Sequence, residues 1–287
     1  MNINWYPGHM KKTVDQLKKI ISMVNIVYEL VDARIPISSK NPILDEILKN
    51  TPRIICLNKA DMAEEKRTME WIEYFQNLGI TTVAINCKDK NTFSILLKKT
   101  QEIMSEKVAK DLKKGIQNTR TRLMIAGIPN VGKSTFINAI SQKNQLETGN
   151  RPGVTKSNRW VKTFGNMELL DTPGILWPKI ETEEQRRLLA YTGAIKDEIL
   201  DIESLSFYFI QDMLKLYPER LKERYAINCE MKAVMILDNI GKQTGKLFKG
   251  GEIDYLGVAK MIFSDFRNGK LGRITLESAI NESLGRN

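Results

Sequence analysis

The sequence contains no apolar segment long enough to cross a membrane, and it contains few cysteines. The three that occur, Cys56, Cys87 and Cys229, lack the paired spacing of metal ligands, and an odd number does not indicate a disulfide framework. The N-terminal residues include a Pro-Gly pair where a signal peptide needs an apolar helix. These absences disfavour a secreted disulfide-rich domain or a membrane protein, so we expect a cytoplasmic protein.

Acidic residues are in deficit, and His9 is the single histidine. The 44 lysines and arginines exceed the 34 aspartates and glutamates, which gives a formal net charge of +10. Ten basic residues against four acidic ones fall within residues 88–122, and five against one fall within residues 143–162. One such segment alone is commonly a solvated helix face, whereas several separated basic segments favour a nucleic-acid-binding surface.

Short apolar runs alternate with amphipathic segments through the first part of the chain. Strands that alternate with helices predict an α/β domain with a mostly parallel six-stranded sheet, helices on both of its faces and one antiparallel hairpin. We expect strands within residues 24–34, 53–61, 80–86 and 121–127, and a two-stranded hairpin within 159–174. We expect helices near residues 10–22, 42–49, 64–79 and 91–117, and a further helix that begins at 133.

The pattern changes near residues 178–183, after which apolar residues are spaced only for helices. We therefore expect two domains, residues 1–178 with the sheet and residues 179–287 as a smaller all-helical domain. The second contains a basic, glycine-rich segment at residues 241–251. Its lysines are candidate contacts to RNA phosphates, although an ordinary flexible connection between helices has the same composition. These lysines are Lys242, Lys246 and Lys249.

Residues 127–135, GIPNVGKST, match a phosphate-binding loop between a strand and a helix. Its glycines let backbone N–H groups turn toward phosphates, and the helix N-terminus adds partial positive charge. Lys133 is expected to contact the terminal phosphates and to act in catalysis, and the Ser134 hydroxyl is expected to bind Mg²⁺. The expected nucleotide contacts of this loop are Asn130, Val131, Gly132, Lys133, Ser134 and Thr135.

Two later segments suit a metal-dependent nucleotide site. Asp171 and Gly174 belong to the segment DTPG, in which we expect the aspartate to hold Mg²⁺ through water and the glycine N–H to meet the γ-phosphate. Thr155, in a basic loop punctuated by glycine and proline, is the candidate second metal ligand that senses the γ-phosphate. Both assignments depend on the phosphate loop, because DTPG and a loop threonine are common on their own.

Residues 58–61, Asn-Lys-Ala-Asp, end an expected strand and suit a guanine pocket. Asp61 can accept hydrogen bonds from guanine N1–H and the exocyclic amine, two donors that adenine does not present together. Asn58 is expected to brace the loop and Lys59 to lie along the ring. The backbone of Asn86, Cys87 and Lys88, after the next strand, is a candidate cover for the base.

The base-recognition residues precede the phosphate loop by about seventy residues, whereas the phosphate loop usually comes first in nucleotide-binding α/β domains. All these segments follow strands, and the carboxyl ends of neighbouring strands meet at one edge of a sheet. Spatial neighbourhood matters for a site, and chain order does not. The order therefore predicts a circular permutation of one guanine-nucleotide site, with the helix and linker of 91–120 spanning the new join.

With these motifs, the chain resembles the circularly permuted GTPases, and most closely the bacterial ribosome biogenesis GTPase A family. The resemblance rests on WYPGHM at 5–10, VDARIP at 31–36, LNKAD at 57–61, GIPNVGKST, RPGVT at 151–155, DTPGILWPK at 171–179 and TGAIKD at 192–197. It implies late assembly of the large ribosomal subunit, and a GTP-gated helical domain that binds RNA. Asp32 and Arg34 of VDARIP are expected to be structural ties at a strand end, with a ligand role as the alternative.

Hydrolysis needs a group that orients the attacking water, and Ile175 and Leu176 follow Gly174 where many GTPases have a glutamine. Three sources remain open. One is His9, which could fold over the nucleotide or could be an ordinary turn histidine. The second is K⁺, because Asn130 matches the residue that similar potassium-stimulated GTPases use. The third is a group supplied by the partner.

The sequence favours a GTP-hydrolysing assembly factor that binds the large-subunit precursor in the GTP state and leaves after hydrolysis. The alternative is a GTP-dependent regulatory switch that binds a protein partner. An ATP-dependent RNA-remodelling enzyme is disfavoured by Asp61. Salt dependence separates the first two functions, because phosphate contacts weaken steeply with salt and an apolar protein interface does not.

Overall fold

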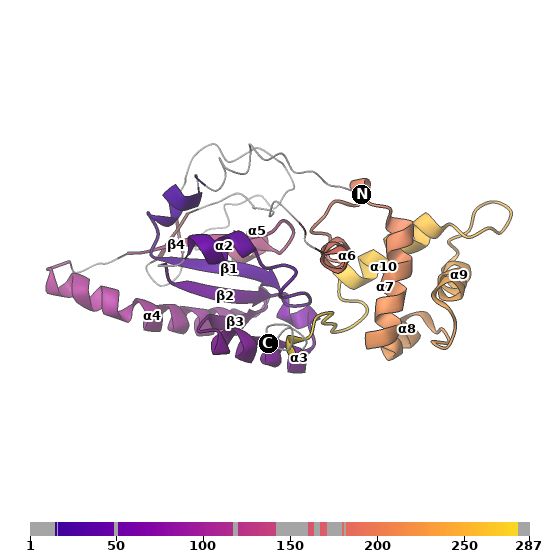
Figure 1. The fold of residues 1–287 in the computed structure, drawn as a ribbon, viewed down its shortest axis with the longest axis horizontal. Helices are drawn as coiled ribbons and strands as arrows, with labels where there is room; N and C mark the ends of the chain where they lie inside the picture. The colour runs from indigo at the N-terminus through magenta and orange to yellow at the C-terminus, as the bar shows by residue number, and fades with distance from the viewer. Residues whose placement is uncertain are drawn as a thin grey trace.

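The computed structural model describes residues 15, 17–48, 51–116, 120–141, 160–163, 167–170, 180 and 182–280. Its sheet has the strand order β3-β2-β1-β4-β6-β5. Figure 1 shows β1, β2 and β3 side by side. Five strands form the parallel part, and the sixth, β5, pairs antiparallel with β6 at one edge. The predicted α/β architecture, a mostly parallel sheet with one antiparallel hairpin, is thus confirmed. The strands are β1 Ile26–Asp32, β2 Arg53–Asn58, β3 Thr81–Ile85, β4 Thr121–Gly127, β5 Trp160–Lys162 and β6 Met167–Leu170.

Helices cover both faces of the sheet because the central strands are apolar on both sides. In β1 every residue is buried, and Tyr28 faces α4 and α5 while Val31 faces α3. The Tyr28 ring meets the edge of Phe136 at 6.2 Å, and its hydroxyl pairs with the Thr100 hydroxyl at 2.6 Å. The helices of this part are α2 Pro42–Ile47, α3 Glu65–Asn77, α4 Lys90–Lys113 and α5 Lys133–Ile140, with the short 3₁₀ helix η1 Ala60–Met62.

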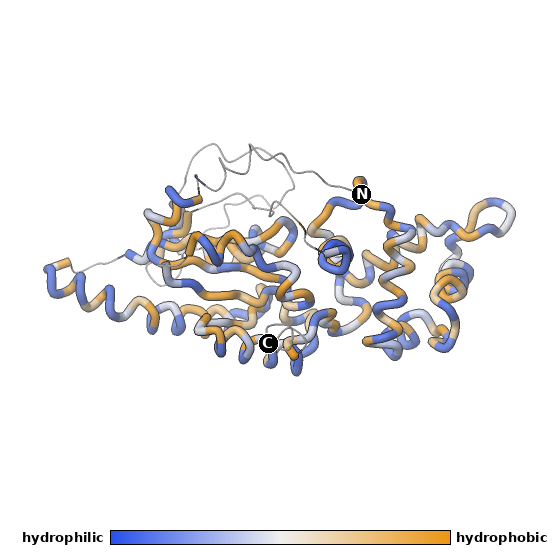
Figure 2. Tube along the Cα trace, viewed as in Figure 1, coloured by the Kyte–Doolittle hydropathy of each residue, from blue (hydrophilic) through white to orange (hydrophobic). Residues whose placement is uncertain are grey.

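Helix α4 is the longest helix described and extends past the sheet (Figure 1). It packs against the sheet through Phe93, Leu96 and Met104, and Asp89 caps its N-terminus by accepting from Asn91 N. Hydrophobic residues line the strands, whereas α4 carries mixed hydrophobic and hydrophilic residues (Figure 2). The amphipathic helix predicted for residues 91–117 is therefore confirmed over most of its length.

Residues 182–280 contain helices and no strand that the structure describes, as their helical spacing predicts. Their core is aromatic: Tyr191 meets Phe209 edge-on at 5.0 Å and stacks with Phe263 at 5.9 Å. Burial of each such ring contributes about 1.5–3 kcal/mol to stability. The elements are α6 Glu183–Tyr191, η2 Asp197–Ile199, α7 Ile202–Leu216, α8 Pro218–Tyr225, α9 Ala233–Thr244 and α10 Tyr255–Arg267.

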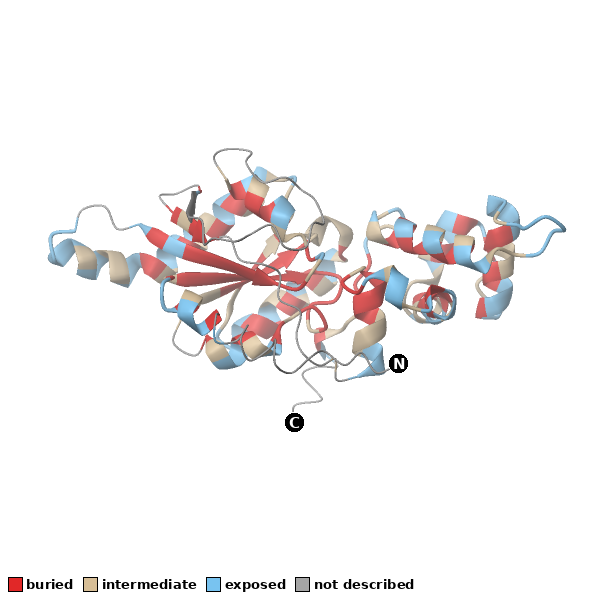
Figure 3. Cartoon of the chain, turned by 90° about the horizontal axis from the view of Figure 1, so that it is seen from above, coloured by how far each residue is buried: buried red, intermediate tan, exposed pale blue. Residues whose placement is uncertain are grey.

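After α10 the chain returns to the α/β part, a feature that the sequence pattern does not indicate. Ile274 N donates to Met62 O at 2.9 Å, and Leu276 N donates to Arg34 O at 2.8 Å. The Glu277 carboxylate accepts from the backbone N–H groups of residues 37 and 38, at 2.7 and 2.9 Å. Ile274, Leu276 and Ala279 of this returning segment are buried. Figure 3 shows that buried residues are concentrated in the strands of the sheet.

None of the helices in the described ranges combines the length and the apolarity that a membrane-crossing segment requires.

Candidate functional site

The guanine motif and the phosphate loop meet at the carboxyl edge of the sheet. Asn58 ends β2 and pairs in register with Asp32 of β1 and Ile85 of β3. On the other side of β1, Leu30 pairs with Gly127, the last residue of β4. In parallel sheets this edge is where ligands bind. The base-recognition and phosphate-binding segments, far apart in the chain, are therefore neighbours in space.

The phosphate loop is shaped by two glycines that no other residue could replace without displacement. A Cβ atom at Gly127 would lie 2.7 Å from the Leu30 carbonyl oxygen. Gly132 has φ of 101°, and a Cβ atom there would lie 2.4 Å from Asn58 Nδ2. Positive φ and close approach both favour glycine. The loop therefore fits tightly against β1 and against the first residue of the guanine motif.

Lys133, at the first turn of α5, turns its side chain back into the loop. Its ammonium donates to the carbonyl oxygens of Gly127 at 2.9 Å and Ile128 at 2.8 Å. An ammonium has three donors, so one remains for a phosphate oxygen. Burial lowers the pKa of Lys133 to about 8. Ser134 and Thr135 follow and are exposed at the helix N-terminus, where a hydroxyl and backbone N–H groups can meet phosphate and Mg²⁺.

Asn58 joins three motifs through one buried side chain. Its Nδ2 donates to Val131 O in the phosphate loop at 2.8 Å, and its Oδ1 accepts from Cys87 Sγ at 3.3 Å. The side chain is only 2% exposed, so these contacts satisfy a polar group that would otherwise be costly to bury. The geometry places Asn58 where the bracing role predicted for it requires.

Lys59 connects the guanine motif to the phosphate loop and to β1. It takes the left-handed conformation with φ of 61°. Its ammonium donates to Asn130 O and to Asp32 Oδ2, both at 2.9 Å. Burial lowers the pKa of Lys59, and the Asp32 carboxylate opposes this shift. Burial would by itself raise the pKa of Asp32, but the charges of Arg34 and Lys59 hold it well below its ordinary value.

Asp61 and residues 86–88 flank this cluster. The Asp61 side chain is 26% exposed, and its ion pair with Lys88 is long, at 3.9 Å, so the carboxylate is available to a base. Burial, followed by the Asp61 charge, raises the pKa of Cys87 to about 11, so this thiol stays protonated. Asn86 Oδ1 accepts from Lys88 N at 3.0 Å and holds the turn after β3.

Four predicted site residues lie outside the described residues, and the structure does not test them: His9, Thr155, Asp171 and Gly174. Among the residues that the structure does describe, no group of three or more His, Cys, Asp or Glu side chains is arranged to hold a metal ion. The predicted Mg²⁺ set has only Ser134 within them. A hydroxyl oxygen is a ligand that Mg²⁺ accepts, and Mg²⁺ usually takes few protein ligands when phosphates are present.

Comparisons with known proteins identify the family of this chain. A family model described as "50S ribosome-binding GTPase" matches residues 122–237. Ribosome biogenesis GTPase A of Bacillus cereus is 46% identical over 279 residues, which cover 97% of this chain and 94% of that protein. The chain belongs to the ribosome biogenesis GTPase A family. The corresponding protein of Thermotoga maritima is 31% identical over 277 residues, 96% of this chain and 94% of that one.

Two solved structures are similar to this chain in fold. A GDP-bound structure of YlqF matches with a TM-score of 0.67 and covers 92% of this chain and 98% of that one. A GNP-bound structure of YlqF from T. maritima matches with a TM-score of 0.66 and covers 93% and 98%. Both are 27% identical to this GTPase.

Sequence reasoning named Asp32, Arg34 and Asn130 but did not identify which groups they contact. Arg34 forms a two-pronged ion pair with Asp32, with both N···O distances 2.8 Å, and is 1% exposed. Asn130 Nδ2 donates to Gly193 O, in the segment after α6, at 2.6 Å. Arg34 lies in VDARIP, Asn130 in GIPNVGKST and Gly193 in TGAIKD, but a linear pattern does not show what they contact.

Nucleotide binding by this GTPase is expected to weaken roughly three- to four-fold between pH 7.0 and 8.5. Burial lowers the pKa of Lys133 to about 8, so the charged fraction of its amine falls from about nine-tenths to about one-quarter over this range. Phosphates favour the ammonium form, so binding takes up a proton near pH 8. Calorimetric titration with GDP in two buffers of different ionisation enthalpy measures this uptake. Equal affinity at both pH values would contradict the prediction.

Proposed function

We propose that this protein is a circularly permuted GTPase that hydrolyses GTP to GDP and phosphate in ribosome assembly. It binds the large-subunit precursor in the GTP state and is released after hydrolysis. The observation that carries the GTPase assignment is the direct bonding of the guanine motif to the phosphate loop, through Asn58 to Val131 O and Lys59 to Asn130 O. The ribosomal role rests on family membership and on the relatives' names.

The permutation is supported by the order of strands and motifs. The guanine motif follows β2 and the phosphate loop follows β4, and β1 lies between these strands in the sheet. Helix α4 spans the connection between the two halves. We propose that residues 1–178 form the GTPase domain and residues 179–287 the helical domain, to which the return segment at 271–280 adds a second connection.

Chemistry at the site requires positive charge placed before the reaction starts. Mg²⁺, when bound by Ser134, Thr155 and Asp171 (the last through water), supplies charge that neutralises the β- and γ-phosphates. Lys133 holds the loop and directs its remaining N–H toward the terminal phosphates. Asn130 presents its amide oxygen for K⁺ while its amide nitrogen is held by Gly193. We propose that K⁺ and the ribosomal particle both stimulate turnover.

His9 is proposed to orient the attacking water, because Ile175 and Leu176 after DTPG have no polar side chain for this role. His9→Ala is expected to leave GTP affinity within a few-fold and to slow particle-stimulated turnover by roughly ten-fold or more. Single-turnover assays with saturating large subunits measure this step. An unchanged stimulated rate would remove His9 from the mechanism.

The helical domain is proposed to bind RNA through residues 241–251, which include the end of α9 and the turn after it. After α9 the chain forms a hairpin in which Phe248 N donates to Glu252 O at 2.8 Å and Asp254 N donates to Lys246 O at 2.9 Å. Lys242 and Lys249 are exposed and Lys246 is partly buried. Phe248 is 59% exposed at the hairpin, where an aromatic ring among cations can stack on an unpaired base.

Changing Lys242, Lys246 and Lys249 together to glutamine is expected to weaken large-subunit binding. The slope of log affinity against log salt is expected to fall by about 2–3, because each lost lysine–phosphate contact lowers it by about 1. Filter binding between 50 and 200 mM KCl measures both. The matched control changes three exposed lysines of α4 and its end, Lys98, Lys113 and Lys114. Equal losses in the two triple variants would indicate nonspecific charge and would contradict the assignment.

The direct test of the proposed function is GTP turnover with and without purified large ribosomal subunits, in K⁺ and then in Na⁺ buffer. Stimulation by the particle, larger in K⁺, is the expected result. GTP-dependent binding that resists salt and needs no RNA would favour the alternative, a switch with a protein partner. Equal competition by ATP would overturn guanine selectivity.

A further inference from the structure

Two consecutive residues at the carboxyl end of α10, Phe266 and Arg267, connect the helical part to the nucleotide motifs. Neither residue belongs to a motif that predicts nucleotide contact. From each residue a series of hydrogen bonds leads to the nucleotide site. One series reaches the guanine motif, and the other reaches the phosphate loop.

The first series runs from Phe266 to Lys59. The Phe266 carbonyl accepts from Arg34 Nη1 at 3.2 Å, and its ring lies under the guanidinium, 4.7 Å from ring centre to Arg34 Cζ. Arg34 Nε and Nη2 bind the two oxygens of Asp32. Asp32 Oδ2 then accepts from Lys59 Nζ. Arg34 and Asp32 are 1% and 2% exposed, so both are fixed by burial as well as by their bonds.

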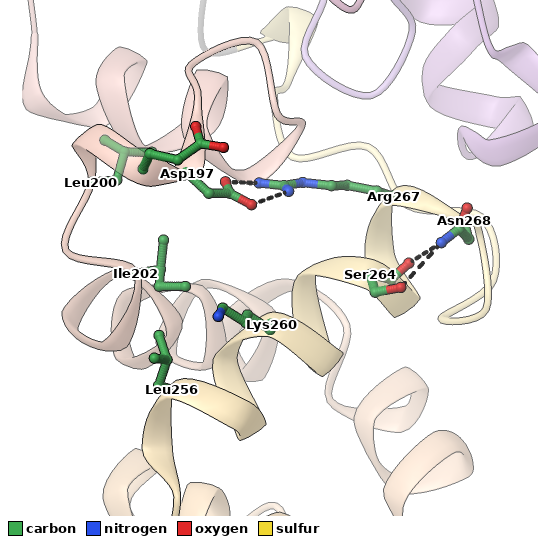
Figure 4. A pocket seen from close by; sticks show the side chains of 9 residues that line it. Asp197, Leu200, Ile202, Leu256, Lys260, Ser264, Arg267 and Asn268 are labelled. Atoms are coloured by element: carbon green, nitrogen blue, oxygen red, sulfur yellow. Dashed lines mark hydrogen bonds and ion pairs between the residues drawn. The ribbon is translucent and has the colours of Figure 1, made fainter.

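The second series runs from Arg267 to Asn130. The Arg267 guanidinium donates to Tyr191 O at 2.9 Å and Ala190 O at 2.8 Å, at the end of α6. It also pairs with both oxygens of Asp197 at 2.7 and 2.8 Å (Figure 4). This grip shapes the turn that contains Gly193, whose carbonyl accepts from Asn130 Nδ2.

Gly193 itself is pressed against Arg267. Its φ is 77°, and a Cβ atom at this position would lie 3.2 Å from Arg267 Nε. The guanidinium therefore packs directly on the backbone that meets the phosphate loop. The two series join at Lys59, whose ammonium also donates to Asn130 O. The contacts thus form a continuous series from Phe266 through Lys59 and Asn130 to Arg267.

A cavity of about 640 Å³ lies beside Arg267, between η2, the start of α7 and α10 (Figure 4). Its lining includes Asp197, Lys260 and Arg267 and no residue of the nucleotide motifs. One side of the Arg267–Asp197 pair therefore faces open space rather than packed core, so this grip can be altered without disturbing the interior of the helical part.

We propose that Phe266 and Arg267 are positioning residues of the nucleotide site, which hold Lys59 and Asn130 in place when the end of α10 is docked. The inference rests on the proposed binding of guanine nucleotide. Coupling between two sites is reciprocal, so nucleotide must also strengthen the docking of α10. The docking of α10 and the affinity for nucleotide are then coupled, so a change in one changes the other.

Arg267→Gln is expected to weaken GDP binding by roughly five- to ten-fold, in the range typical of coupled sites. Arg267→Lys is expected to show the same loss, because it keeps the charge but not the fork that holds two carbonyls and Asp197. The matched control is Arg273→Gln, which removes an exposed ion pair to Glu65, also between the two parts of the chain, at 3.2 Å. It is expected to bind GDP within two-fold of wild type. Fluorescent GDP titration measures all four proteins.

Hydrogen exchange with and without GDP distinguishes coupling to the nucleotide site from a purely structural role of Arg267. GDP is expected to slow exchange at residues 190–194 and 264–268 of wild type, and this slowing is expected to be absent in Arg267→Gln. Exchange within α7 and α9 reports whether the variant is folded. If it is not, Gly193→Ala replaces it, since the added Cβ would lie 3.2 Å from Arg267 Nε and alanine is strained at φ of 77°, so the turn must shift away from Arg267.

Three results would overturn the inference. They are wild-type affinity in Arg267→Gln, wild-type affinity in Arg267→Lys with a loss only in the glutamine variant, and GDP-dependent slowing that persists in the variant. The second would show that charge alone matters. Failure of the wild-type chain to bind guanine nucleotide is a separate result, which would overturn the proposed function itself.

Discussion

Lys133→Ala is expected to slow GTP hydrolysis by roughly 100- to 1000-fold, the loss usually seen when one preorganised charge is removed from an active site. The amine is held in the loop by the carbonyls of Gly127 and Ile128, so it is in position before the nucleotide arrives. Alanine removes the donor that faces the terminal phosphates, and a water molecule in its place carries no charge. Steady-state turnover at saturating GTP, with large subunits present, measures the effect.

Lys98→Ala, on the exposed face of α4, is the matched control and is expected to leave turnover unchanged. Thermal unfolding of both variants checks that the loop change has not unfolded the domain. A Lys133→Ala protein that is folded and retains turnover within five-fold of wild type would mean that the amine only stabilises the loop.

Asp61→Asn is expected to lower GTP affinity by about 10³- to 10⁵-fold and to create a preference for xanthosine triphosphate. The carboxylate accepts from guanine N1–H and the exocyclic amine, whereas an asparagine amide has one acceptor and one donor group. Xanthine carries a carbonyl in place of the amine, so it matches the amide and leaves no buried group unpaired. The Asp61 carboxylate is 26% exposed and makes only a long ion pair with Lys88, at 3.9 Å, so it is available for direct contact with a base.

Competition of both nucleoside triphosphates against fluorescent GDP measures this exchange of specificity. Asp89→Asn is the control, because Asp89 follows the same base-covering segment but caps α4, and asparagine caps a helix equally well. If Asp61→Asn lost GTP without gaining the xanthine nucleotide, the residue would be structural and the guanine assignment would need another acceptor.

The sheet was predictable because local patterns carry its information. The apolar run of β1 is buried on both faces, and β2 ends at Asn58, where the expected strand turns polar. Parallel pairing then brings Asn58 and Gly127 to one edge whatever their order in the chain. The glycines of the phosphate loop could be read in the same way, since a close turn needs them for steric reasons.

The ties between the two parts of the chain were not predictable in this way. Arg34 and Phe266 are 232 residues apart in sequence, and Ile37 and Glu277 are 240 apart. No periodicity or composition connects such pairs, because their bonds depend on how the chain returns after α10. Asn130 illustrates the limit: its position in the motif indicates a role at the phosphates, while its bond to Gly193 O depends on packing.

The sequence alone indicated the family and most of the strands and helices, and it predicted which groups meet a guanine nucleotide. These depend on residue type and spacing over a few residues, where covalent geometry and side-chain chemistry act directly. Only the tertiary structure decided which of those groups are held from the helical part, and by which atoms. Hydrogen bonds and ion pairs act over about 3 Å, so they can be assigned only when distant segments are placed beside one another.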